Sequence, residues 1–252
     1  MTTPFSLNGM NVLITGGSSG IGRQCAISCS NMGADVILIA RDEERLQQTL
    51  SQLSDGDHAY YVMDLLDFEK YVDMITSIVK RHGKISGFIH SAGVDSTVPL
   101  SASKPDVIDE VFRINALACF ELIRLLSKKK NVGKNASFIG MASVMATRTQ
   151  KGVMPYCASK AALLNGLKSL ALELAPKNIR VNTVSPAIVE TELVAHLFST
   201  MSDQNIEKIK SKHPLGFGSP IDVANLCVYL LSPAARWSTG TDYIIDGGYT
   251  AQ

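Results

Sequence analysis

The chain has 252 residues, of which 46 % are hydrophobic and 19 % are charged, a balance that supports a sizeable buried core and argues against disorder. The net charge is +1, from 24 basic and 23 acidic residues, which disfavours a nucleic-acid-binding or membrane-surface protein. With no apolar run of roughly 20 residues, no signal-peptide pattern and five irregularly spaced cysteines, the sequence indicates a cytoplasmic protein with reduced thiols.

Short apolar runs alternate with longer segments of helical spacing along the chain. Because the runs are continuously apolar, they indicate strands that are covered on both faces. The predicted strands are residues 11–15, 35–40, 59–62, 85–90, 136–140, 180–185 and 243–246. The predicted helices include residues 20–32, 45–53, 68–82, 106–130 and 155–175. This alternation predicts one α/β domain over residues 1–252, a Rossmann-type doubly wound sheet of seven parallel strands with helices on both faces.

Residues from about 190 to 220 interrupt this rhythm, since no further helix pattern is evident before Pro220. A long excursion that follows a strand typically forms a lid or a binding loop, and a static surface insertion is the alternative. We predict a substrate lid here. The predicted lid contains the apolar residues Val194, Leu197, Phe198 and Met201. It offers few cations, which argues against a highly phosphorylated substrate.

The first predicted strand leads into a glycine-rich turn, Thr15-Gly16-Gly17-Ser18-Ser19-Gly20-Ile21-Gly22, which opens a helix. Glycines permit a tight turn and a close approach of the main chain to a pyrophosphate, and a helix N-terminus presents free N–H groups to it. The spacing differs from GxGxxG, and the Gly-Lys-Ser/Thr of a P-loop is absent. The turn predicts a dinucleotide site, with Gly16, Ser18, Ser19, Gly20 and Ile21 as cofactor-binding residues.

The end of the second strand bears on the choice between NADP and NAD. An acid at this place binds the ribose 2′-hydroxyl, whereas an arginine accepts a 2′-phosphate. The chain has Arg41 followed by Asp42. We favour NADP over NAD, with Arg41 as the phosphate partner and Asp42 as the N-cap of the next helix; Asp42 as the ribose acid is the alternative.

Tyr156 and Lys160 are four residues apart, so they lie on one face of a helix, one turn from each other. A nearby lysine cation lowers the pKa of a tyrosine, which then exchanges a proton with a carbonyl or an alcohol. Ser143 follows the fifth strand, at the edge where open α/β sheets bind ligands. A serine hydroxyl there polarises a substrate oxygen, although Ser143 as a simple cap is the alternative.

Taken in chain order, motifs along nearly the whole chain resemble those of the short-chain dehydrogenase/reductase family. The glycine turn looks like the TGxxxGIG cofactor loop of that family. Asp64, with Leu65 beside it, resembles the residue that holds the adenine amine. His90-Ser91-Ala92-Gly93 is similar to the NNAG segment, which suggests cofactor contacts for Ser91, Ala92 and Gly93.

The second half of the chain continues the resemblance. Asn115 resembles the asparagine that binds a water in the proton relay, and Ser143, Tyr156 and Lys160 match the other catalytic positions. Ser185-Pro186-Ala187-Ile188-Val189-Glu190-Thr191 looks like the loop that holds the nicotinamide carboxamide and the pyrophosphate, which implicates Pro186, Ile188 and Thr191. The segment from Tyr243 to Gly248 looks like the last strand of the family and its ending.

The resemblance implies an NAD(P)(H)-dependent oxidoreductase, commonly a homotetramer, that transfers hydride between nicotinamide and a small-molecule carbonyl or secondary alcohol. Tyr156 would be the acid/base, Lys160 would also bind the nicotinamide ribose, and no metal or nucleic-acid partner is expected. A 3-oxoacyl thioester reductase is one candidate, and a sugar, polyol or steroid dehydrogenase is the alternative. A non-catalytic NADP-binding sensor and a sugar-nucleotide epimerase are further rivals.

The chain departs from the family pattern in three places. The first residue of NNAG is His90, for which we expect a structural role because a lone histidine at a strand end is more often structural. Pro-Gly after the sixth strand is Pro186-Ala187. The basic residue that many NADP-dependent members carry in the glycine loop is absent, since Ser18 and Ser19 stand there.

Overall fold

The computed structural model describes residues 3–199 and 201–251, without the side chains of residues 193, 196 and 197. Among the residues singled out above, the side chain of Leu197 therefore lies outside the described part. Residues 1, 2, 200 and 252 of the predicted domain lie outside it as well.

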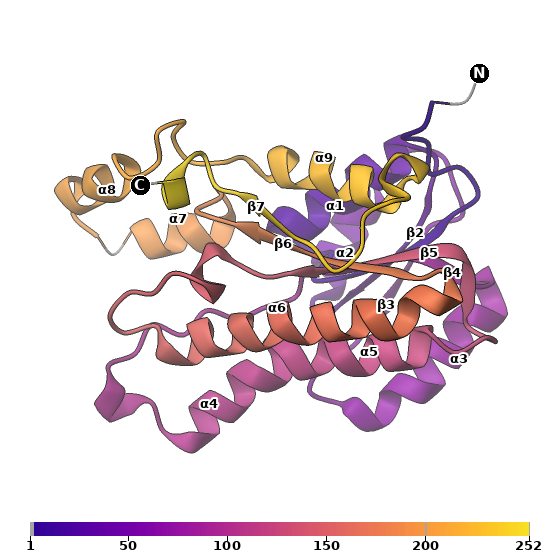
Figure 1. The fold of residues 1–252 in the computed structure, drawn as a ribbon, viewed down its shortest axis with the longest axis horizontal. Coiled ribbons are helices and arrows are strands. Elements are labelled where there is room, and N and C mark those ends of the chain that lie inside the picture. The colour runs from indigo at the N-terminus through magenta and orange to yellow at the C-terminus, as the bar shows by residue number, and fades with distance from the viewer. Residues whose placement is uncertain (1–2, 200, 252) are drawn as a thin grey trace.

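A parallel sheet of seven strands forms the centre of the described chain, in the order β3-β2-β1-β4-β5-β6-β7 (Figure 1). Its strands are β1 (Asn11–Thr15), β2 (Asp35–Ala40), β3 (Ala59–Val62), β4 (Ile85–His90), β5 (Val132–Met141), β6 (Arg180–Pro186) and β7 (Asp242–Ile245). All neighbouring strands run parallel, which confirms the predicted doubly wound sheet. The strand order reverses between β1 and β4, and a crevice at the carboxyl ends of such strands is the usual ligand site.

Helices cover both faces of the sheet because successive strand residues point to opposite sides. Val12, Ile14 and Leu38 belong to one buried cluster, and Leu13, Ile37 and Ile39 belong to another. Figure 1 shows the helices of the first face, which are α1 (Gly20–Asn31), α2 (Glu43–Leu50) and α9 (Pro220–Leu231). The second face carries α3 (Tyr71–His82), α4 (Pro105–Phe112), α5 (Ala118–Leu126) and α6 (Met154–Leu174).

The first four strands have the predicted bounds, whereas β5 begins earlier than predicted, at Val132. Val132 pairs with Ile85, and the register then shifts before Gly87 pairs with Ser137. The early residues of β5 include the exposed Lys134 and Asn135, so they lack the apolar pattern of a buried strand. The polar residues at the start of β5 are therefore the reason why this part of the strand was not predicted.

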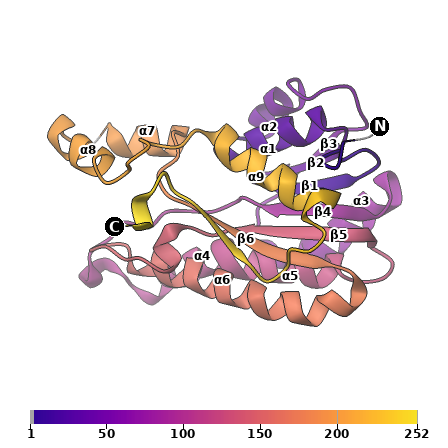
Figure 2. The same ribbon diagram turned by 45° about the horizontal axis from the view of Figure 1, so that its top comes forward.

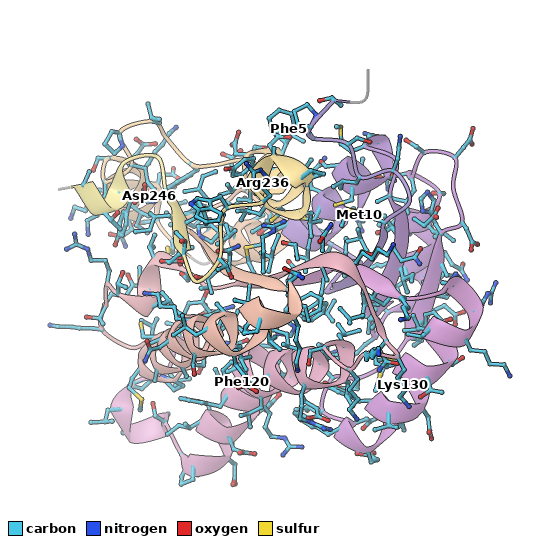
Figure 3. All side chains as sticks on the ribbon, turned by 45° about the vertical axis from the view of Figure 1, so that its right-hand side comes forward. Phe5, Met10, Phe120, Lys130, Arg236 and Asp246 are labelled. Carbon is cyan, nitrogen blue, oxygen red and sulfur yellow. The ribbon has the colours of Figure 1, made fainter. Side chains whose placement is uncertain are left out.

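The predicted helix over residues 106–130 is interrupted and ends early. A π-helical turn, η3 (Arg113–Leu117), separates α4 from α5, and α5 ends at Leu126. The three lysines at 128–130 therefore lie beyond the helix, in the turn before β5. Figure 3 shows Lys130 and Asp246 at opposite ends of the molecule, which places this basic run far from the carboxyl edge of the sheet.

The segment from about 190 to 220 is helical, contrary to the expectation of a helix-free excursion. It contains α7 (Glu192–Phe198) and α8 (Asp203–Lys210), which project beyond the carboxyl end of the sheet (Figure 2). Its two ends are joined, because Gly218 N donates to Ile188 O at 3.0 Å and Glu190 N donates to Gly218 O at 2.8 Å. This pairing closes the segment into a loop that starts and ends at the same place.

None of the described helices combines the length and the apolar character that are needed to cross a membrane. The described residues also hold no cluster of three or more histidine, cysteine, aspartate or glutamate side chains that suits a metal ion.

Candidate active site

One cavity of about 880 Å³ opens at the carboxyl ends of the strands, where the strand order reverses. It runs from the glycine turn and the end of β2 to the helical segment that carries α7 and α8. The predicted site residues that line it are Gly16, Ser18, Ser19, Gly20, Ile21, Arg41, Asp64, Leu65, Ser91, Ala92, Gly93, Ser143, Tyr156, Lys160, Pro186, Ile188 and Thr191. Asn115 lies outside the described lining.

The glycine turn is closely packed against the segment that follows β4. Gly16 has a φ of +70°, and a Cβ on it would lie 2.7 Å from Ala92 N, so no other residue fits without a shift. The N-terminus of α1 follows, and Ser19, its N-cap residue, accepts no hydrogen bond from the described N–H groups through its side chain. Ser19, Gly20 and Ile21 line the cavity, so the uncapped first turn of α1 fits the pyrophosphate of a dinucleotide.

The two residues after β2 have different environments. Asp42 caps α2, since its Oδ1 accepts a hydrogen bond from Arg45 N at 3.0 Å, and this confirms the predicted cap. Arg41 extends into solvent beside the cavity, with Nη1 3.8 Å from Asp64 Oδ2. An exposed ion pair at this distance is weak. The guanidinium of Arg41 is thus accessible to a phosphate, whereas the Asp42 carboxylate is partly used by the helix.

Tyr156 and Ser143 meet at the inner end of the cavity. Tyr156 lies in the first turn of α6, and Ser143 follows β5 and caps the short helix η4 (Val144–Ala146), accepting from Met145 N at 3.1 Å. The Ser143 hydroxyl lies close enough to Tyr156 to favour its phenolate form. A carbonyl oxygen placed against this pair would meet two hydroxyl groups, which is the arrangement needed to polarise it and to protonate it.

Lys160 is buried one helical turn beyond Tyr156, and its Nζ donates to Met141 O at 2.7 Å. Nζ also lies 5.7 Å from the centre of the Tyr156 ring. Burial disfavours the charged ammonium and lowers the pKa of Lys160 to about 8.

The pKa of Tyr156 contradicts the expectation that Lys160 lowers it. Burial raises the pKa of Tyr156 to about 12, and the hydrogen bond with Ser143 only partly opposes this shift. The physical reason is that desolvation of the phenolate outweighs a cation whose hydrogen bond goes to a main-chain carbonyl. In this state Tyr156 is protonated at neutral pH.

Asn115 lies in the π-helical turn η3 and is fully buried. Its Oδ1 accepts from Val94 N at 2.8 Å, and its Nδ2 donates to Val94 O and to Ser159 Oγ, each at 3.0 Å. The side chain thus joins the segment after β4 to α6. These contacts brace the two elements, and Asn115 Oδ1 keeps a second lone pair for a further donor.

His90 is buried between β1 and η3. Its Nε2 donates to Ile114 O at 3.1 Å, so its Nδ1 accepts from Thr15 Oγ1 at 2.9 Å. Burial, together with the nearby charge of Lys160, lowers the pKa of His90 to about 3, so the ring is neutral. These contacts support the structural role expected for this histidine.

The helical segment forms the outer wall of the cavity at its substrate end. Val194, Phe198 and Met201 of this segment line the cavity, together with Val94 and Val144 from other parts of the chain. His213, which the sequence did not mark as a site residue, also lines the cavity. Its Nδ1 donates to Ile209 O at 2.9 Å, and its Nε2 has no partner among the described residues.

Three charged residues near the cofactor end also escaped the sequence analysis. Glu192, the first residue of α7, pairs with Arg45 at 2.8 Å and with Arg23 at 3.7 Å. Arg45 lies in the first turn of α2, three residues after the N-cap Asp42. This spacing is the signal in the sequence that could have pointed to Arg45. The pairing itself joins distant parts of the chain, so only the fold reveals it.

Comparison with known proteins shows that the chain is similar to several enzymes. A family model described as enoyl-(acyl carrier protein) reductase matches residues 16–250. The chain is 32 % identical over 245 residues to the 3-oxoacyl-[acyl-carrier-protein] reductase of Rickettsia conorii, covering 97 % of this chain and 98 % of that one. It is 30 % identical over 251 residues to the NADP-dependent (R)-specific alcohol dehydrogenase of Lentilactobacillus kefiri, covering 98 % of each.

The fold also has a close structural counterpart. A crystal structure of a dehydrogenase/reductase from Sinorhizobium meliloti 1021 superposes with a TM-score of 0.91 at 32 % identity, covering 99 % of this chain and 98 % of that one.

Proposed function

The chain belongs to the short-chain dehydrogenase/reductase family, and on that premise we propose that it is an NADP(H)-dependent oxidoreductase of small-molecule carbonyls and secondary alcohols. The presence of Tyr156, Ser143 and Lys160 in the same cavity as the glycine turn is the observation that carries this proposal. When bound, the nicotinamide supplies the hydride chemistry.

The residues of this chain handle the substrate oxygen and its proton. Ser143 donates a hydrogen bond to the carbonyl oxygen and orients it. Tyr156 is protonated at neutral pH, so it gives its proton to that oxygen as the carbonyl is reduced. We expect Lys160, whose Nζ lies 5.7 Å from the centre of the Tyr156 ring, to bind the nicotinamide ribose and to supply positive charge near Tyr156. Asn115 keeps α6 and the segment after β4 in register.

NADP is the proposed cofactor because of the groups at the end of β2. Arg41 presents an exposed guanidinium beside the cavity, while Asp42 is engaged as a helix cap. A planar guanidinium suits a phosphate, and an acid directed at the ribose would have favoured NAD. That a relative is named as NADP-dependent supports the same choice.

The proposed substrate class is a ketone with an apolar chain, and a 3-oxoacyl thioester is the first member to test. The apolar wall from Val94, Val144, Val194 and Phe198 supports it. The name of the Rickettsia relative supports the same class.

A homotetramer in the cytoplasm completes the proposal. The resemblance supports the assembly, and so do the large apolar side chains of Leu172 and Trp237, which are exposed in the single chain. The five free, buried cysteines support a reducing compartment. Light scattering of the purified protein measures the mass of the assembly.

The deciding experiment is a turnover screen of the purified protein with NADPH and NADH. The panel contains 3-oxoacyl thioesters, sugars, polyols and steroid ketones. We expect NADPH-dependent reduction of a member of the panel, with NADPH preferred over NADH. Tight NADPH binding without turnover of any carbonyl or alcohol would contradict the proposal and favour a sensor.

A further inference from the structure

Glu192 joins the helical segment to both helices beside the cofactor end of the cavity. Its Oε2 lies 2.8 Å from Arg45 Nη2 on α2, and its Oε1 lies 3.7 Å from Arg23 Nη1 on α1. The carboxylate is therefore bound closely to Arg45 and lies within ion-pair distance of Arg23, which is on a different helix. Arg23 is further fixed by hydrogen bonds to Ser18 O and Thr49 Oγ1, so its position is set by the glycine turn and by α2.

Arg45 faces the same part of the cavity as Arg41. Asp42 caps α2 and directs the first turn of this helix, which puts Arg45 among the lining residues with Arg41 and Glu192. Arg45 is about half exposed, as is Glu192, and only a weak contact of 3.6 Å links Arg45 Nε to Asp42 Oδ2. The guanidinium of Arg45 is therefore held mainly by a carboxylate that belongs to another part of the fold.

A guanidinium has five N–H donors, so Arg45 has donors left for a second anion. A phosphate with about two negative charges is a stronger acceptor for them than a carboxylate. A carboxylate held beside that phosphate also repels it. Glu192 is therefore expected to weaken the binding of a phosphorylated ribose more than that of an unphosphorylated one.

We propose that Arg45 is a second cation for the cofactor 2′-phosphate, beside Arg41, and that Glu192 competes with the phosphate for it. The inference rests on the proposed NADP-dependent function and adds two residues that set the strength of cofactor selection. Arg45 favours NADPH, and Glu192, which contacts Arg45 from α7, opposes that preference.

The test measures the dissociation constants of NADPH and NADH for the full-length protein by fluorescence titration. In Arg45→Gln we expect NADPH to bind about tenfold more weakly and NADH to change less than about twofold, as for the loss of a charge-assisted hydrogen bond. In Glu192→Gln we expect NADPH to bind about threefold more tightly, with NADH unchanged, because a repelling charge has been removed.

Glu207→Gln is the matched control, since Glu207 is exposed on α8 of the same segment and forms no ion pair among the described residues. It should leave both constants unchanged. Both test positions are about half exposed, so the variants are expected to fold, and retained NADH binding reports a folded cavity.

The outcomes separate the inference from the function on which it rests. A wild-type protein that binds neither dinucleotide, or that prefers NADH, overturns the proposed NADP-dependent function and the inference with it. Clear NADPH preference that is unchanged in Arg45→Gln overturns the inference alone. Weakening of both cofactors in Glu192→Gln also overturns it, because the ion pair would then only hold the helical segment in place.

Discussion

Lys160 Nζ donates a 2.7 Å hydrogen bond to the main-chain oxygen of Met141, and this bond ties the start of α6 to the carboxyl end of β5. The ammonium is nearly inaccessible to solvent, with the residue only 4 % exposed. The same bond fixes the position of Lys160 relative to Tyr156, which lies in the first turn of α6, and to Ser143, which lies two residues beyond β5. Lys160 is thus held close to Tyr156, although burial of its charged ammonium costs free energy of desolvation.

That cost predicts a pH-dependent stability that a Lys160→Met variant lacks. The pKa of Lys160 is lowered to about 8 in the folded protein and returns to its ordinary value near 10.5 on unfolding. Between these values the unfolded chain binds more protons, so the contribution of Lys160 to the free energy of unfolding increases as pH rises. From about pH 7 to about pH 9.5 we expect wild type to gain about 2 kcal/mol relative to the variant.

Chemical denaturation of both proteins at these two pH values measures the difference. Comparison with the variant removes the contributions of all other titrating groups that the two proteins share. A difference in stability that does not change with pH would show that Lys160 keeps its ordinary pKa in the fold.

Tyr156→Phe should lower kcat by about 10²- to 10⁴-fold, because the variant keeps the ring and loses the group that protonates the substrate oxygen. Cofactor affinity should change little, since the turn and Arg41 are untouched. Single-turnover kinetics with NADPH, together with a binding titration, separates the two effects. Appreciable steady-state activity in this variant is incompatible with Tyr156 as the acid/base.

His90→Leu should lower the free energy of unfolding by about 2 to 3 kcal/mol, because buried Thr15 and Ile114 oxygens both lose a partner. His90→Asn brings the residue expected at this place of the family and retains a donor and an acceptor, so it should lose about half as much. Urea denaturation measures both. Equal stability of His90→Leu and wild type would rule out the proposed bracing role.

Gly16→Ala should disrupt cofactor binding and stability together. The positive φ and the 2.7 Å approach of a Cβ to Ala92 N both oppose a side chain there, which should cost about 2 kcal/mol or more. Gly9→Ala is the matched control, because Gly9 has a φ of +74° with nothing within 4 Å of a Cβ. It should show the smaller cost of the backbone strain alone and normal NADPH affinity, as measured by thermal denaturation and titration.

Much of the site was predictable because it follows from the order of elements. A strand, a glycine turn and a helix place Gly16 and Gly20 at the carboxyl edge of a parallel sheet, and every other strand that ends there adds its own residues. The pattern did not predict the helices α7 and α8, which are short, nor the π-helical turn that orients Asn115. Such features depend on what the segment packs against.

The sequence by itself determined the fold class, the reaction type and many of the residues that line the cavity, because strand periodicity and motif spacing are local properties that each segment carries. Only the tertiary structure decided the charge states and the long-range pairs. The pKa of Tyr156 depends on how deeply the fold buries it, and this burial reversed the shift expected from Lys160 alone. The contact between Arg45 and Glu192 likewise depends on two distant segments meeting across the cavity, which no spacing along the chain specifies.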